Sequence, residues 1–162
     1  MTGDELVWHP QAKWSAAEIL EHLSLAYSRT SERMQPLLEQ DLGEMRGRTS
    51  REWIGGVIVL KLGRIPAGRK APEALSPKGM DPAKARVLVE ERLCQLDAVI
   101  ERCEERFGEK TRVLVHSILG PLSTSEWRRF HCVHTFHHMK QIEALRERLH
   151  GQQNHANAHQ QS

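Results

Sequence analysis

The sequence lacks the features that mark a membrane or exported protein. Its longest apolar run, Ile54–Leu60, contains two glycines and is far shorter than the roughly 20 apolar residues that cross a bilayer. The first ten residues show no basic start followed by an apolar core, as a secretory signal would. We therefore expect a soluble, cytoplasmic protein with no membrane partner.

The sequence also has few cysteines and little excess of charge of one sign. The chain has three cysteines, and Cys94 and Cys103 lie about 13 Å apart along one expected helix, too far for a disulfide. We expect both to be small core residues. Its 23 basic and 21 acidic side chains are mixed along the sequence and give a net charge of +2. Without a basic field we expect no nucleic-acid partner. The 162 residues suffice for one domain, which we place at residues 1–150.

Capping signals and helical periodicity predict four helices. The first begins at Ser15, which forms a capping box with Glu18, and it ends before Gly43 with a kink at Pro36. The second is expected over residues 49–63, although its β-branched run leaves a strand as the alternative. The third follows the Asp81-Pro82 start signal and ends at Gly108, and the fourth covers residues 123–149 with a stop at Gly151.

The segments between these helices differ in length and composition. Residues 64–80 are rich in proline, glycine and basic residues and have no periodicity, which indicates a long connection. Residues 109–122 form a shorter connection that contains His116, and the polar tail 151–162 is expected to be disordered. The sequence therefore predicts an all-α fold, a four-helix bundle with a long connection between the second and third helices.

The sequence is rich in histidine. It has ten histidines, and four of them lie in the eight residues from His131 to His138. At about 100° per residue, His138 lies about 40° from His134, in the middle of the apolar face of the fourth helix. His131 borders the same face, and His137 lies at its edge as an expected structural residue. Two neutral imidazoles one turn apart can direct ring nitrogens to one point, where a divalent metal would sit.

A third ligand is expected from a facing helix. His22 is the only histidine of the first helix, and it flanks the apolar stripe between Ile19 and Ala26. Three histidines would leave a coordination position open, as in catalytic zinc sites. The alternative for each histidine is a core residue bonded to a carbonyl group, which is more common for a single histidine on an apolar face.

These residues resemble the DinB/YfiT-like superfamily of metal-dependent four-helix-bundle proteins. The resemblance rests on His22, on "HSILGPLS" leading into "EWRRF", and on "HTFHHMKQI", and it extends from about Trp14 to Leu149. It implies a divalent ion, commonly zinc or nickel, held by His22, His134 and His138, and often a dimer. Some members resemble thiol-dependent S-transferases that use a small bacterial thiol, and others look like hydrolases.

We therefore expect a metal-dependent S-transferase or hydrolase that acts on a small molecule, with a low-molecular-weight thiol as co-substrate for transfer. The metal would make a nucleophile from water or thiol at neutral pH. His131 and His116 are the candidates for catalytic proton transfer, and basic residues after Gly63 could hold an anionic substrate. The alternative is a non-catalytic bundle that acts through dimerisation or partner binding.

A homodimer is expected from the far side of the fourth helix. Cys132 lies about 160° from His134, on the face that also carries Phe136 and Met139. This face is more apolar than a solvated helix surface should be, so we expect a second copy of the chain to cover it.

Overall fold

The computed structural model describes residues 1–11, 13–66, 68 and 70–160. This part of the chain is mostly helical, with one small antiparallel sheet. In chain order the elements are α1 (Gly3–Val7), α2 (Ala16–Met34), the 3-10 helix η1 (Gln35–Glu39), α3 (Ser50–Gly56), the π-helical turn η2 (Val57–Lys61), the 3-10 turn η3 (Glu73–Leu75), α4 (Pro82–Phe107), β1 (Arg112–His116), β2 (Gly120–Ser123) and α5 (Thr124–Gln160).

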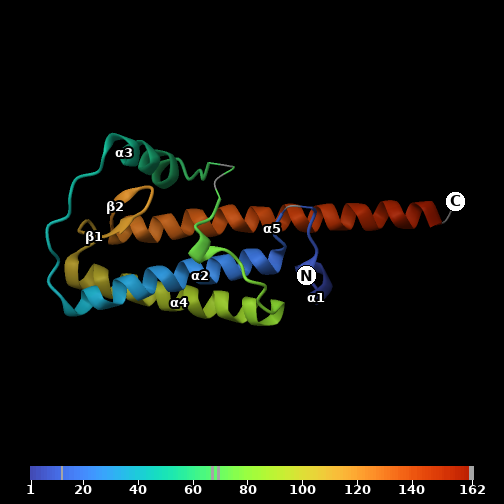
Figure 1. Cartoon of the computed structure of the whole chain (residues 1–162), viewed down its shortest axis with the longest axis horizontal. Coiled ribbons are helices and arrows are strands. Elements are labelled where there is room, and N and C mark those ends of the chain that lie inside the picture. The colour runs from blue at the N-terminus through green and yellow to red at the C-terminus, as the bar shows by residue number, and fades with distance from the viewer. Residues whose placement is uncertain (12, 67, 69, 161–162) are drawn as a thin grey trace.

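Three long helices enclose the core. α2 and α4 lie side by side and run in the same direction, and α5 runs beside them in the opposite direction (Figure 1). The shorter α3 and η2 complete the fold, because η2 packs against α5 and α3 lies near the hairpin. Large apolar side chains of α2, α4, the hairpin and α5 form one cluster, which includes Ile19, Leu23, Tyr27, Leu96, Ile100, Leu119, Leu122, Trp127 and Leu145.

The predicted starts of α2 and α4 are confirmed, and capping residues set both boundaries. Ser15 and Glu18 form the expected capping box at the start of α2, and Asp81 accepts a hydrogen bond from the backbone N–H of Lys84 at the start of α4. Pro36 falls in the 3-10 helix η1, where α2 ends. Residues 50–61 are helical, so the strand alternative for the second segment is wrong.

The connection after α4 is more ordered than its sequence predicted. Residues 112–123 form an antiparallel hairpin in which His116 pairs with Gly120, whose φ of 72° favours glycine. Val113 and Leu114 of β1 are buried, as is all of β2, so the hairpin closes one end of the core. Each strand has only four or five residues, too few to show a clear alternation in the sequence.

Three other predictions differ from the structure. α5 continues past Gly151 to Gln160, so the predicted stop is wrong and residues 151–160 are helical where we expected disorder; a glycine within a helix costs only about 1 kcal/mol relative to alanine. Residues 161 and 162 of the predicted tail lie outside the described residues. Cys94 is exposed, contrary to its expected core position, whereas Cys103 is buried, and both are free thiols. The single domain at residues 1–150 stays a prediction.

None of the described helices is both long enough and apolar enough to cross a membrane.

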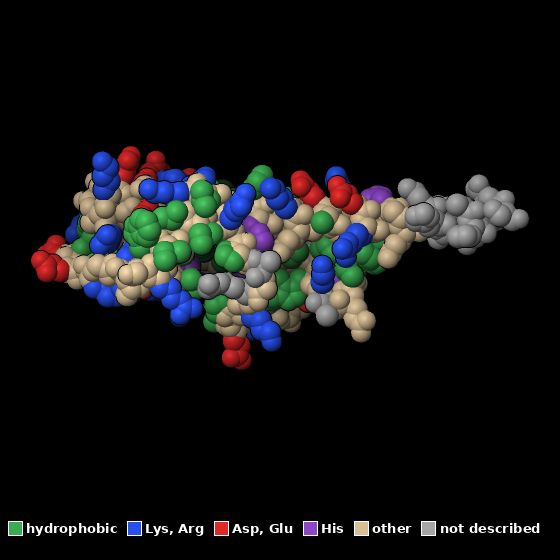
Figure 2. Space-filling model, turned by 90° about the horizontal axis from the view of Figure 1, so that it is seen from above, with side chains coloured by type: hydrophobic (Ala, Val, Ile, Leu, Met, Phe, Trp, Pro, Cys, Tyr) green, Lys and Arg blue, Asp and Glu red, His purple; other side chains and the backbone are tan. Residues whose placement is uncertain are grey.

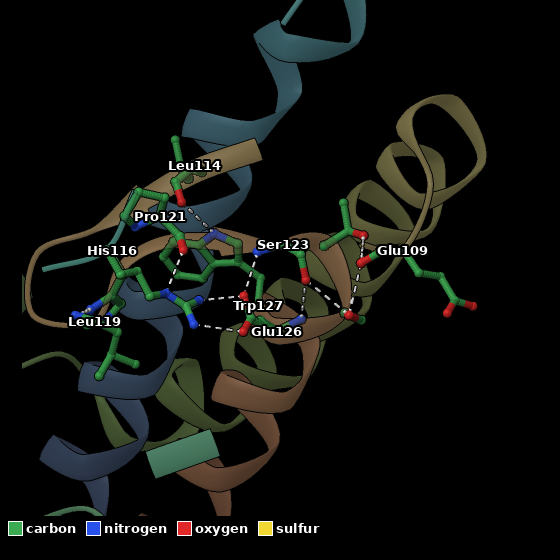
Figure 3. Close-up of polar contacts among 11 residues, drawn as sticks. Glu109, Leu114, His116, Leu119, Pro121, Ser123, Glu126 and Trp127 are labelled. Atoms are coloured by element: carbon green, nitrogen blue, oxygen red, sulfur yellow. Dashed lines mark hydrogen bonds and ion pairs between the residues drawn. The ribbon is translucent and has the colours of Figure 1, made fainter. Parts of the chain in front are cut away.

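The hairpin is fastened to the start of α5 by polar contacts (Figure 3). The Arg48 guanidinium donates to the Pro121 carbonyl oxygen at 2.9 Å and forms a bidentate pair with the Glu126 carboxylate. The indole N–H of Trp127 donates to the Leu114 carbonyl oxygen at 3.2 Å. These contacts hold β1 and β2 against α5 and therefore fix the position of His116.

Replacing Arg48 tests this fastening. Arg48→Met should lower the free energy of unfolding by about 2 kcal/mol, because the partly buried Glu126 carboxylate and the Pro121 carbonyl lose their donors. Urea denaturation measures the change. Arg46→Met is the matched control, since Arg46 pairs with Glu52 in the same segment but is largely exposed, and it should change stability little. Equal losses in both variants would contradict this interpretation.

Candidate metal centre

The structure brings the three predicted ligand histidines together. His22 comes from α2, and His134 and His138 come from successive turns of α5. The Nε2 atom of His134 lies 3.2 Å from Nε2 of His22 and 3.1 Å from Nε2 of His138. One ring nitrogen from each of the three lies within 4.8 Å of the others, so this group could hold a metal ion.

The spacing of these nitrogens suits a small divalent ion. Tetrahedral zinc–nitrogen bonds of about 2.0–2.1 Å separate the ligand nitrogens by about 3.3 Å. Both Nε2 separations at His134 are close to this value. The donor set of three imidazoles is also one that zinc and nickel bind well. The residues present therefore fit a divalent metal.

Hydrogen bonds fix the tautomers of two of the three rings. His22 Nδ1–H donates to the Leu75 carbonyl oxygen at 2.8 Å, and His138 Nδ1–H donates to Oε1 of Gln141 at 2.8 Å. Both acceptors require the proton on Nδ1, which leaves the Nε2 lone pair free to face the centre. Such outer hydrogen bonds orient metal-binding histidines in known sites.

Burial keeps these histidines neutral. It lowers the pKa of His22, against the opposing effect of the hydrogen bond to Leu75, and it lowers the pKa of His138 to about 4. Burial, followed by the charges of His138 and His22, lowers the pKa of His134 to about 2. All three rings are therefore uncharged at neutral pH, and a metal would not have to displace protons from them.

The sequence did not reveal how the connection before α4 reaches this centre. Glu21, which is buried beside His22, accepts hydrogen bonds from the backbone N–H groups of Lys78, Gly79 and Met80 at 2.8–3.1 Å. Glu21 and His22 together hold residues 75–80 against α2. The only signal was the small residues Ala17 and Ser24 at helical spacing from Glu21, which allow close approach of another segment.

His131 and His116 lie near the triad without contacting it. Nε2 of His131 lies 3.1 Å from the Thr30 hydroxyl, and burial lowers the pKa of His131 to about 3. The Phe130 ring separates His116 from His134, with ring centroids 4.5 Å and 5.5 Å away. Their predicted catalytic role is neither supported nor excluded by these contacts and stays a prediction.

His137 lies next to the triad and supports the ring of His138. Its Nε2 accepts a hydrogen bond from the Gln141 side-chain amide at 3.2 Å, and that amide in turn accepts from His138. His137 also packs edge to face against the ring of His138, with ring centroids 5.2 Å apart, so it contacts that ring both directly and through Gln141.

A cavity of about 1240 Å³ opens onto the centre. Its lining includes all three triad histidines together with His116 and His131, and its walls come from α2, α3, η2, the 65–76 segment, the hairpin and α5. Figure 2 shows hydrophobic and basic side chains gathered around a histidine on one face of the molecule. A small molecule in this cavity would reach the triad.

Comparison with protein families places the chain. The model of one family matches residues 4–145, which include all six histidines discussed above. The chain belongs to the DUF1569 family. This family is described as a protein of unknown function, so membership carries no activity with it. No match was found among curated proteins or among solved structures. The wider DinB/YfiT-like resemblance is not confirmed by these comparisons.

The buried histidines predict how stability depends on pH. His116 and His131 have folded pKa values of about 4 and about 3, against 6.5 for an exposed histidine. Unfolded chains therefore bind protons that the folded protein does not, so the metal-free protein should lose stability as the pH falls below about 6.5. Urea denaturation at pH 7.5, 6.5 and 5.5 measures this. His131→Gln should reduce the slope, and a flat profile would contradict the burial of these rings.

Glu21 provides a second test. Glu21→Ala should lower the free energy of unfolding by about 3 kcal/mol, because three backbone N–H groups lose a charged acceptor. Hydrogen exchange of the amides of Lys78, Gly79 and Met80 should accelerate, and the Nδ1–H signal of His22 should weaken in NMR spectra as the connection loosens. Glu32→Ala, an exposed change on α2, is the control. Unchanged exchange at the three amides would refute the anchoring role.

Proposed function

We propose that this protein is a metal-dependent enzyme that holds a zinc or nickel ion with His22, His134 and His138. It acts on a small molecule by thiol-dependent S-transfer or by hydrolysis. The observation that carries this proposal is the meeting of three neutral imidazoles at a cavity of about 1240 Å³, where Nε2 of His134 lies 3.2 Å from Nε2 of His22 and 3.1 Å from Nε2 of His138.

The proposal includes the fold type. α2, α3 with η2, α4 and α5 would be the four helices of a DinB/YfiT-like bundle. Their order supports this, as does the long connection at residues 62–81 between the second and third helices. The origin of the ligands from the first and fourth helices agrees with the same pattern.

Three protein ligands would leave a coordination position open for a substrate atom, and the ion would supply Lewis acidity there. The chain's own residues prepare this position. Leu75 and Gln141 orient the rings of His22 and His138. His131 is the proposed group for proton transfer, because its ring lines the cavity and its buried Nδ1 has no hydrogen-bond partner within the described residues.

The cavity favours transfer over peptidase-type hydrolysis. Zinc peptidases use a glutamate beside the metal as general base. The described residues that line this cavity include no aspartate or glutamate. Glu21, the buried carboxylate nearest in sequence to a ligand, is occupied by three backbone N–H groups. A small thiol as co-substrate needs no such base if it reaches the ion as a thiolate.

The second candidate is a non-catalytic protein that acts through self-association. Phe136 and Met139 on α5 are 62% and 42% exposed, and Leu93 of α4 lines the same shallow groove. This matches the apolar far side expected from the sequence. A homodimer therefore stays a proposal, and it is compatible with either function.

Metal analysis of untagged protein tests the proposed centre. Elemental analysis should find about one zinc or nickel per chain, His138→Ala should lose it, and the folded state should remain. His150→Ala is the matched control, since it removes an exposed histidine of α5 outside the triad, and it should retain the metal. Lack of stoichiometric metal in the native protein, or equal loss in both variants, would contradict the centre.

A transfer screen then separates the two functions. Metal-replete protein should transfer bacillithiol, mycothiol or glutathione to electrophiles, and ester and amide hydrolysis are assayed in parallel. Turnover that disappears in His138→Ala supports the enzyme. Absence of turnover in every class, with the metal bound, would favour the non-catalytic alternative.

A further inference from the structure

The charged side chains that line the cavity all have one sign. Six are basic, and the described lining residues include no acidic one. The chain as a whole is almost balanced, with 23 basic and 21 acidic residues, so composition does not explain this selection. Within the described part of the chain, none of the six forms a salt bridge; they are Lys13, Arg29, Arg33, Arg51, Lys70 and Arg148.

Arg33 is the basic residue whose position is best fixed. It lies in the last turn of α2, and its Nη2 donates to the Val115 carbonyl oxygen of β1 at 3.2 Å. Val115 directly precedes His116 in β1, so this contact brings the guanidinium near His116, and its positive charge contributes to lowering the pKa of that ring. A guanidinium has five N–H donors, so those not used by Val115 remain available to a ligand.

His116 presents a second donor next to Arg33. Its Nδ1 accepts hydrogen bonds from the backbone N–H groups of Ile118 at 3.1 Å and Leu119 at 3.2 Å (Figure 3). An Nδ1 atom that accepts must be unprotonated, so the proton of the neutral ring lies on Nε2. Burial, aided by Arg33, lowers the pKa of His116 to about 4, and the ring therefore stays a neutral Nε2–H donor at pH 7.

The wall around these donors is apolar. Ile54 of α3 and Ile118 of the hairpin line the cavity and are 53% and 43% exposed. Phe130 spans the distance from His116 to the triad, with its ring stacked on His134 at 5.5 Å. The cavity thus has positive and N–H donor groups at the hairpin end, an apolar middle and the triad beyond it.

We propose that the substrate is an amphipathic anion, an apolar small molecule whose terminal carboxylate or phosphate binds Arg33 and the Nε2–H of His116. Its apolar body lies along Ile54, Ile118 and Phe130, and its reactive atom points to the triad. The reactive end rests on the proposed function, whereas the anion subsite depends only on α2 and the hairpin. This places the subsite away from the 64–80 connection, where the sequence suggested it; Lys70 of that connection lines the cavity, and Arg69 lies outside the described residues.

Calorimetric titration with probes that share a phenyl ring and a four-carbon chain tests the subsite. The probes are 4-phenylbutyrate, 4-phenylbutyl phosphate, 4-phenylbutan-1-ol and 4-phenylbutylamine, each titrated into metal-free and zinc-loaded full-length protein. The carboxylate or the phosphate should bind at least about tenfold more tightly than the alcohol, and the amine should not bind. The better of the two anions identifies the preferred head group. Measurement in the metal-free protein separates this subsite from direct coordination of the anion to zinc.

Three variants assign the contacts. Arg33→Gln should weaken anion binding about tenfold and leave alcohol binding unchanged. His116→Asn should weaken it about threefold, because the asparagine oxygen can still accept from Ile118 and Leu119 while the Nε2–H donor is lost. Arg86→Gln is the matched control, an exposed arginine of α4 outside the cavity lining, and it should bind like the wild type.

The outcomes distinguish this inference from the proposed function. Equal binding of alcohol and anions, or equal effects of Arg33→Gln and Arg86→Gln, would overturn the anion subsite. Arg33→Lys, which keeps the charge without the fork of donors, should bind the anion more tightly than Arg33→Gln, and the reverse order would also overturn it. Zinc content is measured in each sample. Loss of zinc binding with intact anion binding contradicts the metal centre alone.

Discussion

The burial of three imidazoles at one point is the constraint on which the rest of this structure depends. His22 and His134 are 112 residues apart in the sequence, yet their Nε2 atoms lie 3.2 Å apart. A buried ring nitrogen without a partner is costly, and two of the three imidazoles bind further groups around them, whereas Nδ1 of His134 has no hydrogen-bond partner within the described residues. His22 requires the Leu75 carbonyl and His138 requires Gln141. The centre thereby fixes α2, α5 and the connection before α4 relative to one another.

The connection is held from two neighbouring positions of α2. Successive helical residues point about 100° apart, so Glu21 and His22 bind different parts of the same segment. His22 binds the carbonyl of Leu75, and Glu21 binds the N–H groups of residues 78–80. His22 supplies a donor and Glu21 an acceptor, so both a carbonyl group and N–H groups of the connection find partners. A segment without regular structure is in this way made part of the cavity wall.

The sequence correctly predicted those features that depend on short-range sequence patterns. The capping residues Ser15 and Asp81 marked the starts of α2 and α4, and helical spacing placed His134 and His138 on one face. The hairpin was missed because its register arises from pairing between short strands. The partners of Glu21 were missed because they lie 57–59 residues away. The donor state of His116 likewise depends on a turn that no periodicity reveals.

The electrostatics of the cavity connect the proposed metal centre to the proposed anion subsite. Ligands such as cysteine thiolate or carboxylate neutralise part of a metal's charge, whereas three neutral imidazoles would leave the full double charge in place. The cavity lining adds six basic side chains, with no acidic residue among those that the structure describes. Positive charge in a partly apolar cavity is stabilised when an anion binds there. This anion would be an anionic substrate or a thiol that arrives as thiolate. The same positive charge would then both select the substrate and activate the incoming nucleophile.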